Sequence, residues 1–105
     1  MTRIYKIVSQ SAWRAAEEAG VFAGAPVDIA DGYIHFSTAA QVEETATKHF
    51  ASQTDLLLVA FDAETFGDAL KWEPSRGGAL FPHLYASLDP RAAVSVRPLQ
   101  LRADG

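Results

Sequence analysis

The chain has 105 residues, of which 49% are hydrophobic and 21% are charged, and its formal net charge is −4 at pH 7. This length and apolar fraction predict one globular domain over residues 1–105 and exclude an intrinsically disordered chain. The acidic balance argues against a long nucleic acid as partner, and the absence of cysteine excludes disulfide scaffolds and thiol catalysis. No apolar run reaches the roughly 18 to 20 residues that span a bilayer, and the first residues lack the apolar core of a signal peptide, so we expect a cytoplasmic protein without a membrane partner.

The first segment predicts a strand followed by a helix. Residues 4–8 are β-branched or aromatic, which is typical of a strand, and Ser9 stands where a helix cap is expected before a helix over 12–19. Helical spacing of the apolar side chains makes Trp13 the expected buried anchor of that helix. Residues 21–31 have no consistent hydrophobic period, and they are predicted to form a loop.

The segment 33–37 alternates between apolar and polar residues, which predicts a strand with two different faces. Ile34 and Phe36 fall on the face expected to join the core. The opposite face, expected to be a polar surface, carries Tyr33, His35 and Ser37.

The remaining elements complete an α+β pattern. Thr38 and Gln41 match a capping box at the start of a second helix, and the continuous apolar run between Asp55 and Asp62 predicts a central strand buried on both faces. Shorter strands are expected over 70–73, 81–88 and 93–97. The sequence therefore predicts an α+β fold with a mixed, largely antiparallel sheet and two main helices.

Two of the three histidines lie in the middle of predicted strands, on the face opposite the core residues. His35 stands between Tyr33 and Ser37, and His83 stands between Phe81 and Tyr85. A histidine on a rigid strand beside hydroxyl groups is suited to proton transfer, so His35 and His83 are the candidate catalytic residues. The alternative is that each is an ordinary surface or structural histidine. Their spacing matches no metal-binding motif, so no metal is expected.

Several other side chains are candidates for binding a ligand. Ser37 and Thr38 stand where a strand becomes a helix, a place that suits a phosphate, although helix capping with Gln41 is the better explanation for Thr38. The segment around Trp72 offers an aromatic ring, a carboxylate and a guanidinium, with a half-buried tryptophan among surface charges as the alternative. The remaining candidates, for charge pairing or ring stacking, are Lys6, Glu73, Arg76 and Tyr85.

Three blocks of the sequence resemble a mainly bacterial family, domain of unknown function 952. The blocks are Asp31-Gly32-Tyr33-Ile34-His35-Phe36-Ser37-Thr38, Lys71-Trp72-Glu73 and Phe81-Pro82-His83-Leu84-Tyr85. The resemblance runs from Tyr5 to about Leu88, and it implies a compact ADP-ribosyltransferase-like fold with NAD as a candidate ligand or cofactor.

That resemblance assigns places to particular residues. The segment from Gly32 is similar to the G-I-Y-F-A-x segment of poly-ADP-ribose polymerases, which puts His35 where a tyrosine stacks on nicotinamide. The tRNA 2′-phosphotransferases are similar in using histidine there. Tyr5 or Lys6 stands where the ADP-ribosyltransferase superfamily usually has histidine, and His83 lies at or beside the place of that superfamily's catalytic glutamate. Two of the three signature positions therefore differ from the ADP-ribosyltransferase pattern.

Three functions follow from these observations. The first is a cleft that binds a nucleotide or a small phosphorylated ligand of the NAD or ADP-ribose type, and the sequence leaves open whether transferase-like or phosphotransferase-like catalysis accompanies binding. The second is a non-catalytic protein-binding or regulatory module, which predicts an exposed apolar rim around Phe81 and Trp72. The third is a metal-independent hydrolase, which requires a carboxylate, with Glu73 the candidate, within hydrogen-bond reach of a histidine.

Overall fold

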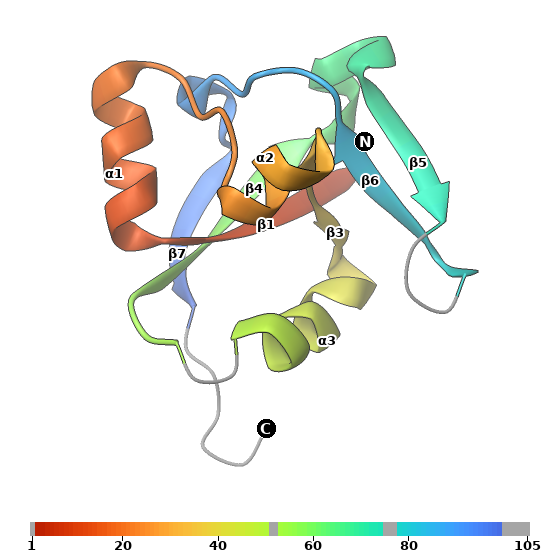
Figure 1. The fold of residues 1–105 in the computed structure, drawn as a ribbon, viewed down its shortest axis with the longest axis horizontal. Helices are drawn as coiled ribbons and strands as arrows, with labels where there is room; N and C mark the ends of the chain where they lie inside the picture. The colour runs from red at the N-terminus through yellow and green to blue at the C-terminus, as the bar shows by residue number, and fades with distance from the viewer. Residues whose placement is uncertain (1, 51–52, 75–77, 100–105) are drawn as a thin grey trace.

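In the part of the chain that the structure describes, two antiparallel sheets are accompanied by three α-helices (Figure 1). The computed structural model describes residues 2–50, 53–74 and 78–99. The strand order is β3-β1-β4-β7 in the first sheet and β2-β6-β5 in the second. The strands are β1 (Arg3–Ser9), β2 (Ile34–His35), β3 (Ser37–Thr38), β4 (Leu56–Asp62), β5 (Leu70–Pro74), β6 (Leu80–Leu84) and β7 (Ser95–Leu99). The helices are α1 (Gln10–Ala19), α2 (Pro26–Asp31) and α3 (Ala39–Phe50), with 3-10 segments at Ala63–Ala69 and Pro90–Ala92. The predicted α+β class with antiparallel strands is confirmed, and α1 and α3 are the two main helices.

The core is built on the two central strands of the first sheet. β1 and β4 pair along their whole lengths, from Arg3 opposite Asp62 to Ser9 opposite Leu56. Trp13 of α1 is 1% exposed, and its ring packs at centroid distances of 6.1 Å from Phe22 and 6.2 Å from Phe61. The predictions of a central apolar strand and of Trp13 as the anchor of α1 are both confirmed.

Replacing Ser9 by alanine is expected to lower the free energy of unfolding by about 1 kcal/mol. The reason is that Ser9 precedes α1 and its Oγ accepts a hydrogen bond from the backbone N–H of Ala12 at 3.2 Å. Urea denaturation measures the loss. Ser11→Ala is the matched control, since Ser11 is exposed and lies within the helix, and an equal loss in both variants would contradict the capping role.

The segment 21–31 is not simply a loop, because it contains the helix α2. Pro26 is the first helical residue, and Gly32 ends the helix with a left-handed backbone, φ 87°. Six residues are too few to display a hydrophobic period, and the one buried residue of α2 is a charged one, Asp28. The prediction of a loop was therefore wrong for its second half.

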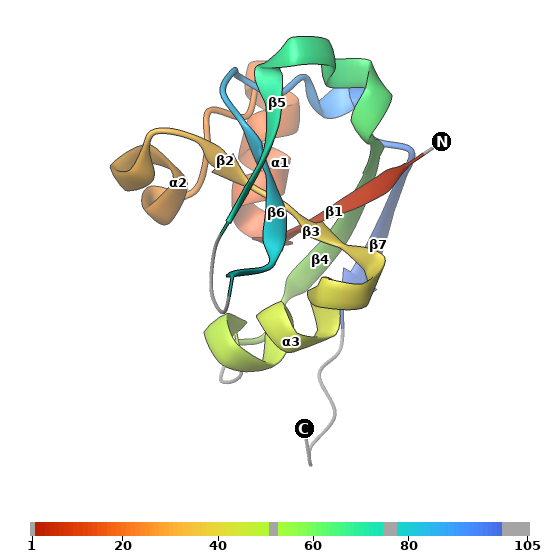
Figure 2. The same cartoon turned by 90° about the vertical axis from the view of Figure 1, so that its right-hand side faces the viewer.

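The predicted strand over 33–37 is divided between the two sheets. β2 pairs with β6 and β3 pairs with β1, while the N–H of Phe36 between them donates to the carbonyl of Pro82 at 3.0 Å. Figure 2 shows the chain passing from β2 into β3. Ile34 and Phe36 are each 2% exposed, as expected for the core face. Ser37, expected on a polar surface, is 5% exposed, because β3 turns it into the space between the sheets.

The C-terminal strands differ from the prediction at their ends. β6 ends at Leu84, so the strand expected over 81–88 is shorter. β7 begins at Ser95 and continues through Pro98. It is an edge strand of its sheet, where a proline without an N–H is tolerated. Among the described residues, no helix is long and apolar enough to cross a membrane.

Candidate functional site

The two candidate histidines lie side by side. His35 of β2 and His83 of β6 are direct partners in the antiparallel pairing of the second sheet. Their ring centroids are 5.5 Å apart, in an edge-to-face arrangement. The alternation of each strand, combined with this pairing, brings both imidazoles to one face of the sheet.

That face forms one wall of a cleft of about 710 Å³ between the two sheets. Residues of β1 line it as well, together with residues from α2, from the segment before it and from α3. The polar side chains that line it include Lys6, Asp31, His35, Ser37 and His83.

Asp28 of α2 is the buried centre of the ionic contacts at this site. Its carboxylate accepts from Lys6 Nζ at 2.9 and 3.1 Å, from the backbone N–H of His35 at 3.1 Å and from that of Ala25 at 2.8 Å, and it contacts His35 Nδ1 at 2.6 Å. Burial by itself raises the pKa of Asp28, but the hydrogen bond with His35 and the charge of Lys6 outweigh it and hold the pKa at about 2. Burial lowers the pKa of Lys6, and the Asp28 charge opposes that change.

His35 is held between two carboxylates. Its Nδ1 contacts Asp28, and its Nε2 lies 2.9 Å from Oδ2 of Asp31. A neutral imidazole has a single N–H, so both contacts are hydrogen bonds at the same time only when the ring is protonated. In either form, both nitrogens of His35 are occupied by the protein's own acids.

His83 contacts a different carboxylate. Its Nδ1 lies 2.8 Å from Oε1 of Glu73 on the neighbouring strand β5, and the Tyr85 hydroxyl donates to the same oxygen at 2.7 Å. The hydrogen bonds from Tyr85 and His83 lower the pKa of Glu73, and the bond to Glu73 raises the pKa of Tyr85 to about 12. Glu73 is therefore a stable anion beside His83.

Tyr33 covers both histidines. Its ring stacks on His83 with centroids 4.1 Å apart and planes 27° apart, and it lies 4.7 Å from the ring of His35 and 5.2 Å from that of Tyr85. Burial raises the pKa of Tyr33, and the negative charges of Asp31 and Glu73 raise it further. This ring cluster fixes the orientation of His83.

The other predicted site residues are distributed differently. Ser37 lines the cleft, but its Oγ is 3.1 Å from Thr45 Oγ1, and Thr38 forms the predicted capping box with Gln41. Trp72 pairs with Pro82 on the strand face away from the histidines, and it is 41% exposed. Arg76 lies outside the described residues.

Three residues of the cluster were missing from the sequence prediction: Asp28, Asp31 and Tyr33. The sequence signal for the two acids is a short helix that begins at Pro26 and ends before Gly32. The carboxylate of its third residue, Asp28, accepts a hydrogen bond from the backbone N–H of Ala25, which precedes the helix. This helix presents Asp28 and Asp31, seven and four residues before His35. Among the described residues, no three histidine or acidic side chains are placed so that they could hold a metal ion together.

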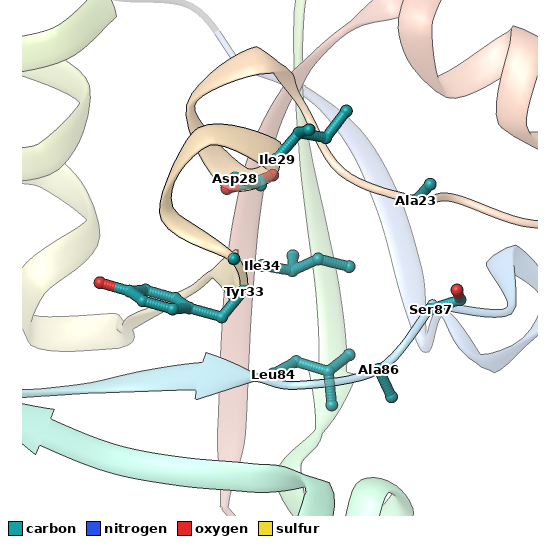
Figure 3. A pocket seen from close by; sticks show the side chains of 9 residues that line it. Ala23, Asp28, Ile29, Tyr33, Ile34, Leu84, Ala86 and Ser87 are labelled. Atoms are coloured by element: carbon teal, nitrogen blue, oxygen red, sulfur yellow. The ribbon is translucent and has the colours of Figure 1, made fainter.

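A second hollow, of about 260 Å³, lies on the other side of α2 (Figure 3). Ile29 lies on one side of it, and Leu84 and Ala86 lie on the other. Neither histidine lines this hollow, whereas both line the larger cleft. Asp28 and Tyr33 line the smaller hollow, but the two histidines select the larger cleft as the candidate site.

Known proteins resemble the chain over nearly its whole length. The crystal structure of CC0527 from Caulobacter crescentus is 51% identical with a TM-score of 0.95, and the match covers 99% of this chain and 91% of that one. The solution NMR structure of CC0527 is 51% identical with a TM-score of 0.89, covering 100% and 90%. No curated protein matches the chain. The model of the family described as protein of unknown function (DUF952) matches residues 7–96, and the chain belongs to this family.

Proposed function

We propose that the cleft binds a nucleotide-type ligand, with NAD or ADP-ribose as the chemistry indicated by the resemblance to ADP-ribosyltransferases. The observation that carries the proposal is the pairing of His35 and His83, 5.5 Å apart, on the wall of the cleft. Its volume of about 710 Å³ falls within the range of small-molecule sites, roughly 300 to 1,000 Å³. Two antiparallel sheets on either side of a ligand cleft are also what that resemblance implies.

The charges around the histidines favour a cationic or neutral part of the ligand at this end of the cleft. Three carboxylates, those of Asp28, Asp31 and Glu73, contact the two histidines. The cations among them are Lys6 and, when protonated, His35. The net charge of these five side chains is then 2 − 3 = −1. The pKa of Tyr33 is raised by burial and also by the charges of Asp31 and Glu73, and that of Tyr85 is raised by its hydrogen bond to Glu73. The pyridinium ring of NAD fits here better than a phosphate does.

The ligand's phosphates are then expected away from Lys6. The ammonium group of Lys6 is already paired with both oxygens of Asp28, and 5% of the residue is exposed. We therefore propose a structural role for Lys6 in place of the charge pairing with a ligand expected from the sequence. Ser37 remains a candidate hydroxyl contact within the cleft.

Titration with NAD, ADP-ribose and AMP tests this function. We expect the imidazole NMR signals of His35 and His83 to shift with NAD and with ADP-ribose, and the larger change with NAD because of its cationic ring. His83→Gln identifies the imidazole signal of His83, because that signal is missing in the variant. Lys48→Gln, which removes an exposed ion pair with Glu44 on α3, serves as the surface control. Signals that stay unmoved across the three ligands would reject a nucleotide cleft.

An apolar surface favours a second candidate function, the docking of a protein partner. Trp72 and Leu80 are 41% and 51% exposed, whereas Phe81, expected in the same rim, is 9% exposed. Trp72 lies on β5, which is an edge strand of its sheet. Isolation of a partner whose binding is abolished by Trp72→Ala and unaffected by His83→Gln would support docking over the ligand cleft.

A further inference from the structure

The contact between Glu73 and His83 determines which nitrogen of His83 carries the proton. An ionised carboxylate is a hydrogen-bond acceptor only, so the 2.8 Å contact requires a proton on Nδ1. Glu73 stays ionised because the hydrogen bonds from Tyr85 and His83 lower its pKa. In neutral His83, the lone pair is therefore on Nε2.

Nε2 is the ring nitrogen of His83 that the described residues leave for a ligand, although the residue as a whole is only 3% exposed. His83 lines the cleft, and Nε2 has no hydrogen-bond partner among the residues that the structure describes. The stacked ring of Tyr33 and the Glu73 contact hold the imidazole in one orientation, and β6 holds the backbone. A fixed base with an unoccupied acceptor nitrogen in a cleft has the geometry required for proton transfer.

His35 lacks this property, although it is the neighbouring imidazole. Both of its nitrogens contact carboxylates, at 2.6 Å from Asp28 and 2.9 Å from Asp31. Accepting a proton from a ligand would require breaking one of these contacts. Of the two histidines, only His83 offers a nitrogen to the cleft without such a loss.

We propose that His83 is the catalytic base of the cleft, with Glu73 as its positioning residue, acting on a water or hydroxyl that attacks a carbon bonded to a cationic ring nitrogen. The O–H bond breaks and its proton goes to Nε2, while the oxygen forms a bond to that carbon. The carbon–nitrogen bond breaks, and its electron pair neutralises the ring nitrogen, so the ring leaves without needing a proton. This assignment rests on the proposed function, because the net negative site is what favours a cationic leaving group.

The tautomer of His83 tests the positioning role without any ligand. We expect nitrogen-15 NMR at neutral pH to show a protonated Nδ1 and an unprotonated Nε2 in the neutral ring. Glu73→Gln should redistribute the proton, because an amide can also donate to Nδ1, whereas Glu73→Asp should restore the wild-type tautomer. Tyr85→Phe is the matched control, since it removes the other partner of Glu73 and should leave the tautomer unchanged. A proton found on Nε2 in the wild-type protein overturns the proposal.

Hydrolysis of NAD, used as the probe, tests the catalytic role. We expect His83→Gln to lower kcat by about a hundredfold or more, and Glu73→Gln to lower kcat with little change in KM. Lys48→Gln is expected to keep the wild-type rate. NAD that binds without being hydrolysed, or a His83→Gln variant as fast as the wild type, overturns the assignment of the base. If NAD fails to shift the imidazole signals, the proposed function fails, and the tautomer of His83 still decides whether the Glu73 pair exists.

Discussion

Replacing Asp28 by asparagine is expected to lower the free energy of unfolding by about 3 to 5 kcal/mol. Asp28 is 1% exposed, and its carboxylate is the counterion of Lys6, which is 5% exposed. Asparagine keeps the shape and one acceptor oxygen, but it leaves the Lys6 ammonium buried without an opposite charge. Such an uncompensated buried charge is among the largest single-residue penalties in proteins. Urea denaturation at neutral pH measures the loss.

Two further variants separate the charge effect from general disruption at Asp28. Adding Lys6→Met to Asp28→Asn should recover part of the lost stability, because the unpaired charge is removed while an apolar side chain of similar length fills the space. Lys48→Gln, which breaks an exposed ion pair, should change stability by less than about 1 kcal/mol. If Asp28→Asn were no more destabilising than Lys48→Gln, the buried ion pair would not be what holds α2 in place.

The parts of the fold that were predicted correctly are those with long, regular patterns. The strand at 4–8, the helix anchored by Trp13 and the apolar run before Asp62 each bury several side chains in register, so their hydrophobic period reflects their environment. The capping box at Thr38 was also predicted, because both of its hydrogen bonds are local in sequence. Such features depend little on the rest of the chain.

The parts that were missed depend on contacts between distant segments. α2 buries a carboxylate in place of an apolar stripe, and what stabilises it is Lys6 on β1, twenty-two residues away. The division of 33–37 between two sheets depends on which strands pair with β2 and β3. Alternation placed His35 and His83 each on a polar face, but only the pairing of β2 with β6 puts them in contact.

The positions of two predicted ligand residues, Glu73 and Trp72, also depend on how the strands pair. Glu73 was expected to bind a ligand or, in the hydrolase hypothesis, to lie within hydrogen-bond reach of a histidine, and its Oε1 lies 2.8 Å from Nδ1 of His83 on the adjacent strand. Trp72, its neighbour in sequence, faces the other side of the sheet, because successive strand residues alternate. Trp72 and Glu73 therefore lie on opposite faces of β5, and of the two it is Glu73 that contacts the histidine cluster.

Acidification is expected to destabilise the protein through Asp28 by about 2 kcal/mol between pH 4 and pH 2. The pKa of this carboxyl is about 2 in the folded protein and 3.8 when exposed. A lowered folded pKa means that the unfolded chain binds the proton first as the pH falls. The stabilisation is therefore complete above about pH 4, and it is lost as the pH approaches 2.

The Asp28→Asn variant isolates this contribution from that of the other acids. Glu64, Glu73 and Asp89 also have lowered pKa values, so both proteins are expected to lose stability in acid. The wild type should lose more, because only it can protonate position 28. Urea denaturation of both proteins at pH 5 and pH 2.5 gives the difference directly. The unfolding free energies of the two proteins should converge toward pH 2. If they instead fall in parallel, Asp28 is not kept ionised by its contacts with Lys6 and His35. The basis for α2 as a helix held in place by charge beside the cleft would then be lost.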